Sequence, residues 1–409
     1  MLALARARRH PSSSVAGPAP TQERLIAPPL PAYDLAAWRA RIPLLGSCIP
    51  MNNCSQAPQT SATKAAAEQY LDSWNRTGMD WDAWMVEVAA SKAAFARLIG
   101  AEPEEIAVTS SVSEATSAVA SALDLAGPRN RVVVTEAEFP TVGQVWLAQE
   151  RRGAKVSWVP VTDGRIDLTA YEPLITDRTM VVSACHGYFL NGFMQDLRAL
   201  GEMVHAHGAL LYADAYQTAG AVPIDVKSLG VDFLASGNLK FLMGIPGIAF
   251  LYVRPGLADT LRPSVTGWFG RVQPFSFDPK RLDWAPGARR FETGTPPVLS
   301  AYIARAGMEM IAELGIERIR AWHEVLARRL IDGGRARGLS LHGVTDAARK
   351  TVSTAFRVEN AHGVEAAMRA RGVLPAARGP VIRLAPHFYT SLDDIDTALD
   401  LLAEVTRSG

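Results

Sequence analysis

The stretch LLYADAYQTAGAVPIDVKSLGVDFLASGNLKFLMGIPGIAFLYVR, residues 210–254, decides the fold. It holds three apolar runs that are too short for helices and are bounded by Gly, Pro, Asn or Asp, which predicts buried strands at 210–213, 232–235 and 247–253. Asp214 follows the first strand directly, and Lys240 lies just past the second. In an α/β sheet, ligands bind outside the carboxyl ends of the strands, so we expect this acid and this lysine to meet over one ligand.

An acid and a lysine in this arrangement suit pyridoxal 5'-phosphate. A lysine forms the Schiff base with the aldehyde, and a carboxylate keeps the pyridine nitrogen protonated so that the ring accepts electrons from a substrate carbanion. Lys240 and Asp214 are therefore the predicted catalytic residues. We predict no metal in this site.

The segment DAYQTAGAVPIDVKSLGVDFLASGNLK, followed by GIPGIAFLYVRP, resembles the class V aminotransferase branch of the fold-type I pyridoxal-phosphate enzymes. That branch holds cysteine desulfurases, selenocysteine lyases, isopenicillin N epimerases and kynureninases. The resemblance extends over roughly residues 52–390. Strand patterns at 106–109, 131–135, 155–159 and 179–184 alternate with helical patterns and bring the strand count to seven. This alternation predicts an α/β fold with a mostly parallel, helix-covered sheet.

Composition sets further bounds. With 409 residues, 48% hydrophobic and 20% charged, the chain can bury a large core. The 42 basic residues nearly balance the 41 acidic ones, which argues against a nucleic-acid or membrane partner. Three cysteines without a CxxC pair argue against a structural metal and favour a reducing compartment, so we expect a cytoplasmic protein.

Three parts are predicted along the chain. Residues 1–31 are rich in Pro, Ser and Ala and read as a disordered tail, although their Arg-rich start also permits a targeting segment. Residues 32–300 are expected to form the large cofactor-binding domain with an N-terminal rim segment. Residues 301–409 are expected to form a small C-terminal α+β domain, with strands near 339–342, 352–358 and 381–384.

The segment TSSVSEA at 109–115 predicts a helix that starts where a strand ends. Ser111 and Glu114 have the spacing of a capping box, and the free N–H groups of such a helix start suit a phosphate. Because the family's phosphate loop resembles this segment, the resemblance implies phosphate binding by the backbone amides of Ser111 and Val112. An ordinary capped helix is the alternative.

The resemblance implies further cofactor contacts. Phe139 stands where kynureninase-like members carry an aromatic ring that stacks on the pyridine. Gln217 corresponds to a glutamine that hydrogen-bonds the phenolic oxygen, and Ser236 is placed to reach the phosphate. Leu239 departs from the family, since most desulfurases and epimerases have His immediately before the lysine.

Two more cofactor contacts are expected to cross between subunits. Trp268 lies in a GWxG segment and Thr295 precedes Pro-Pro, and in kynureninase-like members these segments come from the neighbouring subunit and touch the phosphate. The resemblance therefore implies a homodimer with shared active sites.

Four residues are predicted to face the substrate. Arg383 matches the family arginine that grips the α-carboxylate, and its planar fork of donors suits that role. His186 and Tyr188 follow the fourth strand and are expected near the ligand face, whereas a satisfied core histidine is the alternative. Asn53 lies in the rim segment, beside Cys54, where a polar turn is equally compatible.

The expected chemistry starts with an amino acid that displaces Lys240 to form the external aldimine and leaves the lysine free to take the Cα proton. No cysteine lies between His362 and Arg383, so a persulfide-forming desulfurase is not expected unless Cys54 has been recruited. We predict a lyase that performs β-elimination, as at a C–S bond, or kynureninase-like cleavage. An aminotransferase and an epimerase are the alternatives, and a catalytically silent binding module is the non-enzymatic one.

Overall fold

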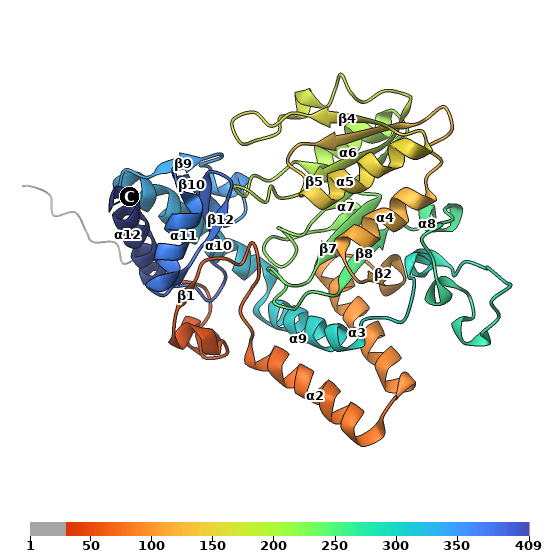
Figure 1. Cartoon of the computed structure of the whole chain (residues 1–409), viewed down its shortest axis with the longest axis horizontal. Helices are drawn as coiled ribbons and strands as arrows, with labels where there is room; N and C mark the ends of the chain where they lie inside the picture. Colours follow the sequence, from red (N-terminus) through yellow and green to blue (C-terminus); the bar gives the residue numbers. More distant parts are fainter. Residues whose placement is uncertain (1–29, 409) are drawn as a thin grey trace, which may run out of the picture. The chain divides into compact units, whose positions relative to one another are not determined.

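A computed structural model describes residues 30–408 of the chain (Figure 1). The segment predicted to be a disordered tail, residues 1–31, lies outside the described residues apart from its last two. The main feature is a seven-stranded sheet with strand order β2-β8-β7-β6-β5-β3-β4. Its strands are β2 (Ile106–Thr109), β3 (Arg131–Thr135), β4 (Lys155–Val159), β5 (Thr179–Cys185), β6 (Leu210–Asp214), β7 (Phe233–Gly237) and β8 (Ala249–Val253).

The predicted mostly parallel α/β sheet is confirmed. Strands β4, β3, β5, β6 and β7 pair in parallel, and β8 runs antiparallel to both of its neighbours. The register pairs Cys185 with Asp214 and Asp214 with Ala235, so β5, β6 and β7 end at one edge of the sheet. Both Asp214 and the loop that carries Lys240 are delivered to this edge.

Except at the edge strand β4, both faces of the sheet are buried, which explains why the other strands read as mostly apolar runs. Along β3, Val132 and Val134 pack into the core on one side while Val133 packs into the core on the other. The first side is covered by α4 (Val112–Ala122) and α5 (Pro140–Ala148). The second is covered by α3 (Trp81–Ile99) and α6 (Leu197–Ala206). The short helices α7 (Val226–Leu229) and α8 (Leu257–Thr260) flank the strands.

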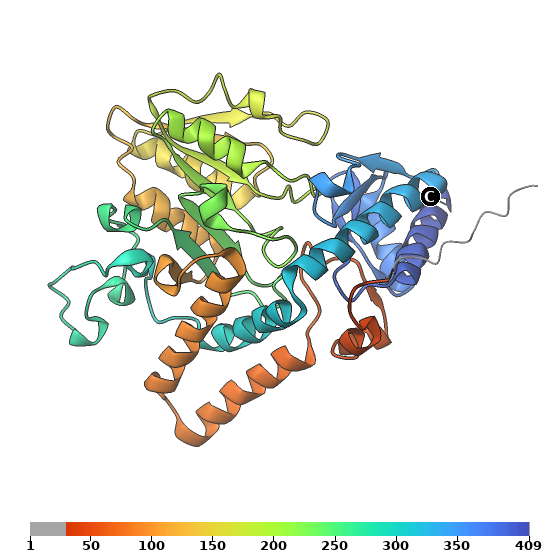
Figure 2. The same cartoon turned by 180° about the vertical axis from the view of Figure 1, so that it is seen from behind.

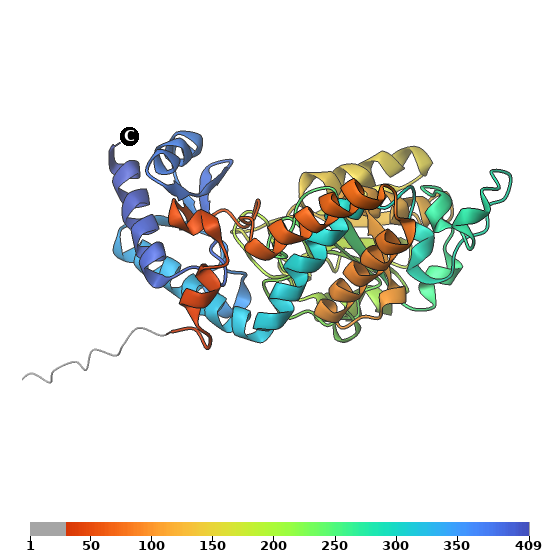
Figure 3. The same cartoon turned by 90° about the horizontal axis from the view of Figure 1, so that it is seen from below.

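Helices α2 (Ser61–Thr77), α3 and α9 (Val298–Leu314) pack together, and Figure 3 shows α2 alongside α9. The sequence is amphipathic over residues 59–83 and 85–99, which predicts two helices that divide at residue 84, but in the structure the break comes earlier. Gly78 ends α2 with a φ of +67°, and the Asp80 carboxylate caps α3 by accepting the N–H of Ala83.

The C-terminal elements form a second, four-stranded antiparallel sheet of order β12-β13-β10-β9. Figure 2 shows α10 running from the end of α9 toward these elements. The predicted boundary at residue 300 falls inside α9, and we propose that the two parts divide at Gly315, between α9 and α10. The elements are α10 (Ile316–Ala336), β9 (Ser340–His342), β10 (Thr354–Arg357), α11 (Ala361–Ala370), β12 (Ala376–Arg378), β13 (Val381–Leu384) and α12 (Leu392–Ser408).

The N-terminal part of the described chain, around residues 49–52, pairs with residues 373–385 near its C-terminal end. After α1 (Leu35–Arg39), strand β1 (Ile49–Pro50) pairs in parallel with β11 (Val373–Leu374), and Asn52 bridges to Ala385. This pairing leads the following residues into the pocket described below. The 3-10 helices are η1 (Pro43–Gly46), η2 (Pro103–Glu105), η3 (Gln149–Arg152), η4 (Leu168–Ala170), η5 (Trp268–Gly270), η6 (Pro274–Ser276), η7 (Gly287–Phe291) and η8 (Ala347–Arg349).

Within residues 30–408, no helix is both long and apolar enough to cross a bilayer. Over the same residues, no group of three or more His, Cys, Asp or Glu side chains has the arrangement of a metal site.

Candidate active site

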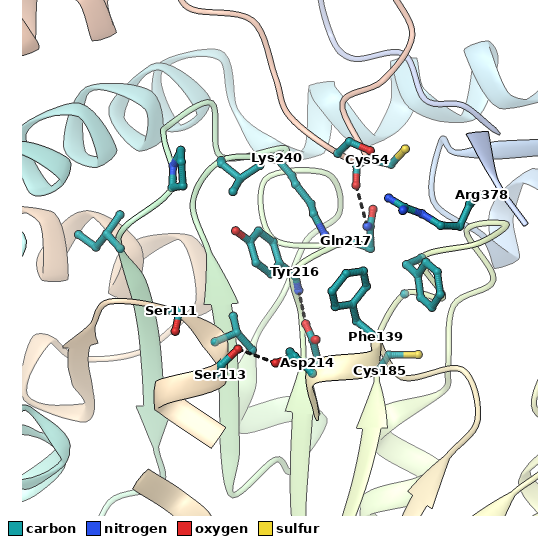
Figure 4. A pocket seen from close by; sticks show the side chains of 18 of the residues that line it. Cys54, Ser111, Ser113, Phe139, Cys185, Asp214, Tyr216, Gln217, Lys240 and Arg378 are labelled. Atoms are coloured by element: carbon teal, nitrogen blue, oxygen red, sulfur yellow. Dashed lines mark hydrogen bonds between the residues drawn. The ribbon is translucent and has the colours of Figure 1, made fainter. Parts of the chain in front are cut away.

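A pocket of about 460 Å³ lies where β5, β6 and β7 end (Figure 4). Its size is that of a site for a cofactor or small molecule. The C-terminal sheet and the segment after β1 contribute to its wall, since Arg383 and Cys54 line it. Seven residues predicted from the sequence line this one pocket: Ser111, Val112, Phe139, Asp214, Gln217, Lys240 and Arg383.

Lys240 is held between aromatic rings. Its Nζ lies 4.0 Å from the ring centre of Tyr216 and 5.5 Å from that of Phe139. Desolvation in the pocket lowers the pKa of Lys240 to about 8, although Asp214 acts in the opposite direction. The positive charges of Arg383 and Arg378 add to the lowering. At neutral pH a usable fraction of this amine is therefore the neutral nucleophile.

This pKa predicts how the cofactor-free protein takes up pyridoxal phosphate. Only the neutral amine attacks an aldehyde, so the rate of covalent attachment should rise about tenfold per pH unit below the pKa and level off above pH 8. Stopped-flow absorbance of the forming enzyme-bound imine measures this rate. A rate that keeps rising to pH 10 would show that Lys240 titrates like an ordinary lysine.

Asp214 ends β6 and is buried at the base of the pocket. Its Oδ1 accepts the N–H of Tyr216 at 2.8 Å. Burial raises the pKa of Asp214 despite that N–H and the charge of Lys240. Glu138 is buried nearby and accepts only the Ser183 hydroxyl, at 3.0 Å, and burial and Asp214 raise the pKa of its carboxyl well above the usual range. These carboxyls lack a full counter-charge, and the protonated nitrogen of a pyridine ring at Asp214 fits that need.

The start of α4 fits a phosphate. The Ser111 hydroxyl accepts the N–H of Glu114 at 3.1 Å, but the Glu114 carboxylate accepts the N–H of Ser110 rather than that of Ser111. The predicted capping box is thus only half formed. Among the described residues, the N–H groups of Ser111, Val112 and Ser113 find no acceptor, and free N–H groups at a helix start bind anions.

Hydroxyl groups extend this anion site. Ser113 and Thr141 lie beside it with their oxygens 2.6 Å apart, and each hydroxyl keeps lone pairs or a proton for a ligand. Both residues line the pocket.

The walls between these ends fit a flat ring. Phe139 lines the pocket, and 39% of its side chain is exposed there. Its ring packs edge-to-face on Phe189, with the two ring centres 5.4 Å apart. The Gln217 side-chain nitrogen donates to the Cys54 carbonyl at 3.0 Å, which leaves its second N–H for a ligand oxygen. A planar heteroaromatic ring with one polar substituent matches this lining.

Arg383 is the most unusual charge in the site. Its side chain is 1% exposed, and its donors reach the Ala376 carbonyl, the Phe189 carbonyl and the Ser55 hydroxyl at 3.4, 2.9 and 3.1 Å. Within the described chain no carboxylate pairs with it. Three of its five N–H groups are engaged, so one on each terminal nitrogen remains, which is the fork that binds a carboxylate.

Six predicted residues lie outside the pocket lining. The Asn53 amide is buried between the Ala385 carbonyl and the Tyr389 hydroxyl, so the next residues, Cys54 and Ser55, face the pocket instead. The Ser236 hydroxyl donates to the neighbouring Gly237 carbonyl.

His186 and Tyr188 depart from the prediction in the same way. Both are buried beside β5, and burial lowers the pKa of His186 to about 4. Tyr188 packs edge-to-face on Phe189, and of these two residues Phe189 lines the pocket. Gly187 and Phe189, in the irregular segment that follows β5, line the pocket instead.

Trp268 and Thr295, predicted to reach a neighbouring subunit's site, lie outside the pocket of their own chain. Trp268 packs edge-to-face against Trp81 and Phe275, with ring centres 5.8 and 5.5 Å apart, and Thr295 is exposed. Their role across a dimer stays a prediction.

Several lining residues escaped the sequence analysis. Tyr216 lies between Asp214 and Gln217 in the DAYQ segment, and this position between two predicted cofactor contacts could have identified it. Ser110 and Ser113 likewise lie inside the TSSVSEA segment, whereas four others were not indicated by the sequence pattern: Thr141, Cys185, Phe189 and Arg378.

Comparisons with known proteins bear on this site. The chain is 37% identical over 369 residues to the uncharacterized aminotransferase YcbU of Bacillus subtilis (strain 168), covering 90% of this chain and 97% of the relative. It is 28% identical over 395 residues to a kynureninase of Burkholderia mallei (strain SAVP1), covering 91% and 92%. The cysteine desulfurase of Thermococcus onnurineus NA1 matches in structure with a TM-score of 0.83 at 24% identity, over 94% of this chain and all of that one, which shows a shared fold.

A second solved structure has the same fold and carries the cofactor. It is a mutant of C-DES with glycine covalently linked to pyridoxal phosphate, and it matches with a TM-score of 0.83 at 19% identity, over 90% of this chain and 99% of that one. Residues 54–377 match the family described as Aminotransferase class-V. With the lysine, the acid and a helix start with free N–H groups in one pocket, this chain belongs to the class-V aminotransferase family and is an enzyme whose cofactor is pyridoxal phosphate.

Proposed function

We propose that the enzyme binds an amino acid by its α-carboxylate, removes the Cα proton and then breaks a bond in the side chain, as a lyase. The buried guanidinium of Arg383 carries this proposal. A buried charge without a partner is strongly unfavourable, and the two free N–H groups of Arg383 match a carboxylate. The substrate supplies the missing anion.

Lys240 is the proposed base. Its pKa of about 8 leaves enough neutral amine at physiological pH to accept a proton. When bound, pyridoxal phosphate supplies an electron sink that stabilises the carbanion and so lowers the pKa of the Cα–H group. Asp214 would hold the positive charge on the ring nitrogen, while the start of α4 and the hydroxyls of Ser113 and Thr141 would hold the phosphate.

Relatives named kynureninase, which match over 82% and 91% of this chain, favour cleavage at the side chain as the proposed reaction. Cys54 and Cys185 line the pocket but are buried, and no cysteine lies between His362 and Arg383. We therefore do not propose a persulfide-forming reaction. We further propose a cytoplasmic homodimer in which Trp268 and Thr295 reach the partner's site.

Transamination is the second candidate, because the relative at 37% identity is named an aminotransferase. One experiment separates the two. The loaded enzyme is incubated with single L-amino acids, without and with a 2-oxo acid, and products are identified by mass spectrometry. A lyase yields side-chain fragments without the oxo acid. Product formation that depends on the oxo acid, with its conversion to an amino acid, would replace the lyase proposal by transamination.

A further inference from the structure

A second arginine, Arg378, faces the pocket from the same sheet face as Arg383. In the antiparallel pair β12–β13, Ala376 is opposite Arg383 and Arg378 is opposite Val381. Side chains alternate along a strand, so residues 376, 378, 381 and 383 share one face, and the two arginines are diagonal neighbours on it. Both line the pocket and both lower the pKa of Lys240.

The two arginines differ in how their donors are used. Arg383 is buried and gives three N–H groups to protein acceptors, whereas Arg378 is exposed at the pocket wall. In residues 30–408 the Arg378 guanidinium has neither a hydrogen-bond acceptor nor an ion-pair partner. All its donors are free for a ligand.

The phosphate does not account for this charge. Figure 4 shows Arg378 across Lys240 from Ser111 and Ser113, so the anion site at the start of α4 lies at the other end of the pocket. Asp214 is the single acidic side chain among the lining residues, and it lies at the base. The substrate end thus presents two guanidinium groups and no carboxylate.

We propose that Arg378 binds a second carboxylate, carried at the end of the substrate side chain, and so selects amino acids with acidic side chains. This rests on the proposed function, in which Arg383 takes the α-carboxylate. A neutral side chain of the same length leaves the Arg378 donors to water, so the difference in affinity measures the contribution of Arg378.

The test uses the cofactor-loaded enzyme and ligands that cannot react. Isothermal titration calorimetry with succinate and with propionate compares a dicarboxylate with its monocarboxylate counterpart. We expect wild type to bind succinate about 10- to 100-fold more tightly, the range for one charge-assisted hydrogen-bonded pair. Arg378→Gln should remove most of this preference while propionate affinity stays within about twofold. Arg383→Gln should weaken both ligands.

The matched control is Arg318→Gln, which changes an exposed arginine of α10 that lies outside the pocket. It should retain the preference for succinate. An unchanged preference in Arg378→Gln, or equal loss of both ligands, would overturn the role of Arg378.

A parallel titration separates this inference from the proposed function. L-Aspartate and L-asparagine are added to the loaded enzyme while the cofactor absorbance is recorded, and aspartate should shift the spectrum at the lower concentration. If both amino acids shift the spectrum at equal concentrations, selection by Arg378 fails while amino-acid binding stands. If neither these nor other amino acids shift it, the proposed function fails as well.

Discussion

Lys240→Ala should lower turnover of the preferred amino acid by at least about 10³-fold, the contribution of a well-placed general base. The alanine variant also loses the amine that joins the cofactor to the protein, so borohydride should no longer fix pyridoxal phosphate to the chain. Turnover and the mass of the borohydride-treated protein check both effects. The pocket itself should persist, since within residues 30–408 the Lys240 side chain makes no hydrogen bond and its ammonium group lies over the rings of Tyr216 and Phe139.

Lys227→Ala is the matched control for that variant. Lys227 lies on α7 with an exposed side chain and does not line the pocket. It should keep wild-type turnover and borohydride fixation. Reductive fixation that survives in Lys240→Ala would place the covalent attachment at another lysine and contradict the site.

Asp214→Asn should reduce turnover by about 10²- to 10³-fold, the loss typical of removing one preorganised electrostatic partner. The amide has nearly the shape of the carboxyl, and its oxygen can still accept the Tyr216 N–H, so the fold at the end of β6 should be retained. What disappears is the negative charge that would hold a proton on the ring nitrogen. The thermal midpoint of the cofactor-free protein should not fall, because burial already disfavours the charged form of Asp214.

Steady-state kinetics and thermal unfolding of Asp214→Asn measure these effects, with Asp225→Asn as control. Asp225 caps α7 by accepting the N–H groups of Lys227 and Ser228, and asparagine caps helices equally well. Turnover of Asp214→Asn within about threefold of wild type would remove Asp214 from the proposed electrostatic role.

The large sheet could be predicted from the sequence because its strands, apart from the edge strand β4, are buried on both faces. Runs such as VVV in β3 and AFLYV in β8 admit few alternatives once Gly, Pro or Asp bounds them. Helix ends were harder to predict: the amphipathic pattern continues to residue 83, whereas the turn at Gly78 and the Asp80 cap set the break between α2 and α3. β12 was missed since PAARG has neither β-branched residues nor alternation.

The site could be predicted where local sequence places a residue, and at Phe139, Gln217 and Arg383 from the family resemblance. Asp214 is the last residue of β6, Lys240 lies three residues past the end of β7, and Ser111 caps a helix, so their positions depend on their own neighbours. Asn53 differs because the bridge from Asn52 to Ala385 sets which rim residues face the pocket, and that register involves two distant segments. Arg378 depends in the same way on the pairing of β12 with β13.

During synthesis, residues 49–55 are made long before residues 373–385, with which they pair in the folded protein. The Ser55 hydroxyl meets Arg383, and β1 finds its partner β11, only after more than three hundred intervening residues have been made. At about 10 residues per second, translation of that interval takes roughly half a minute. Closing so long a loop is slow, because the chain loses conformational entropy before the non-local contacts form and stabilise the closed state. A nascent chain therefore carries Lys240 in a cleft that lacks its outer wall, and firm retention of the cofactor is expected to follow completion of the polypeptide rather than accompany its elongation.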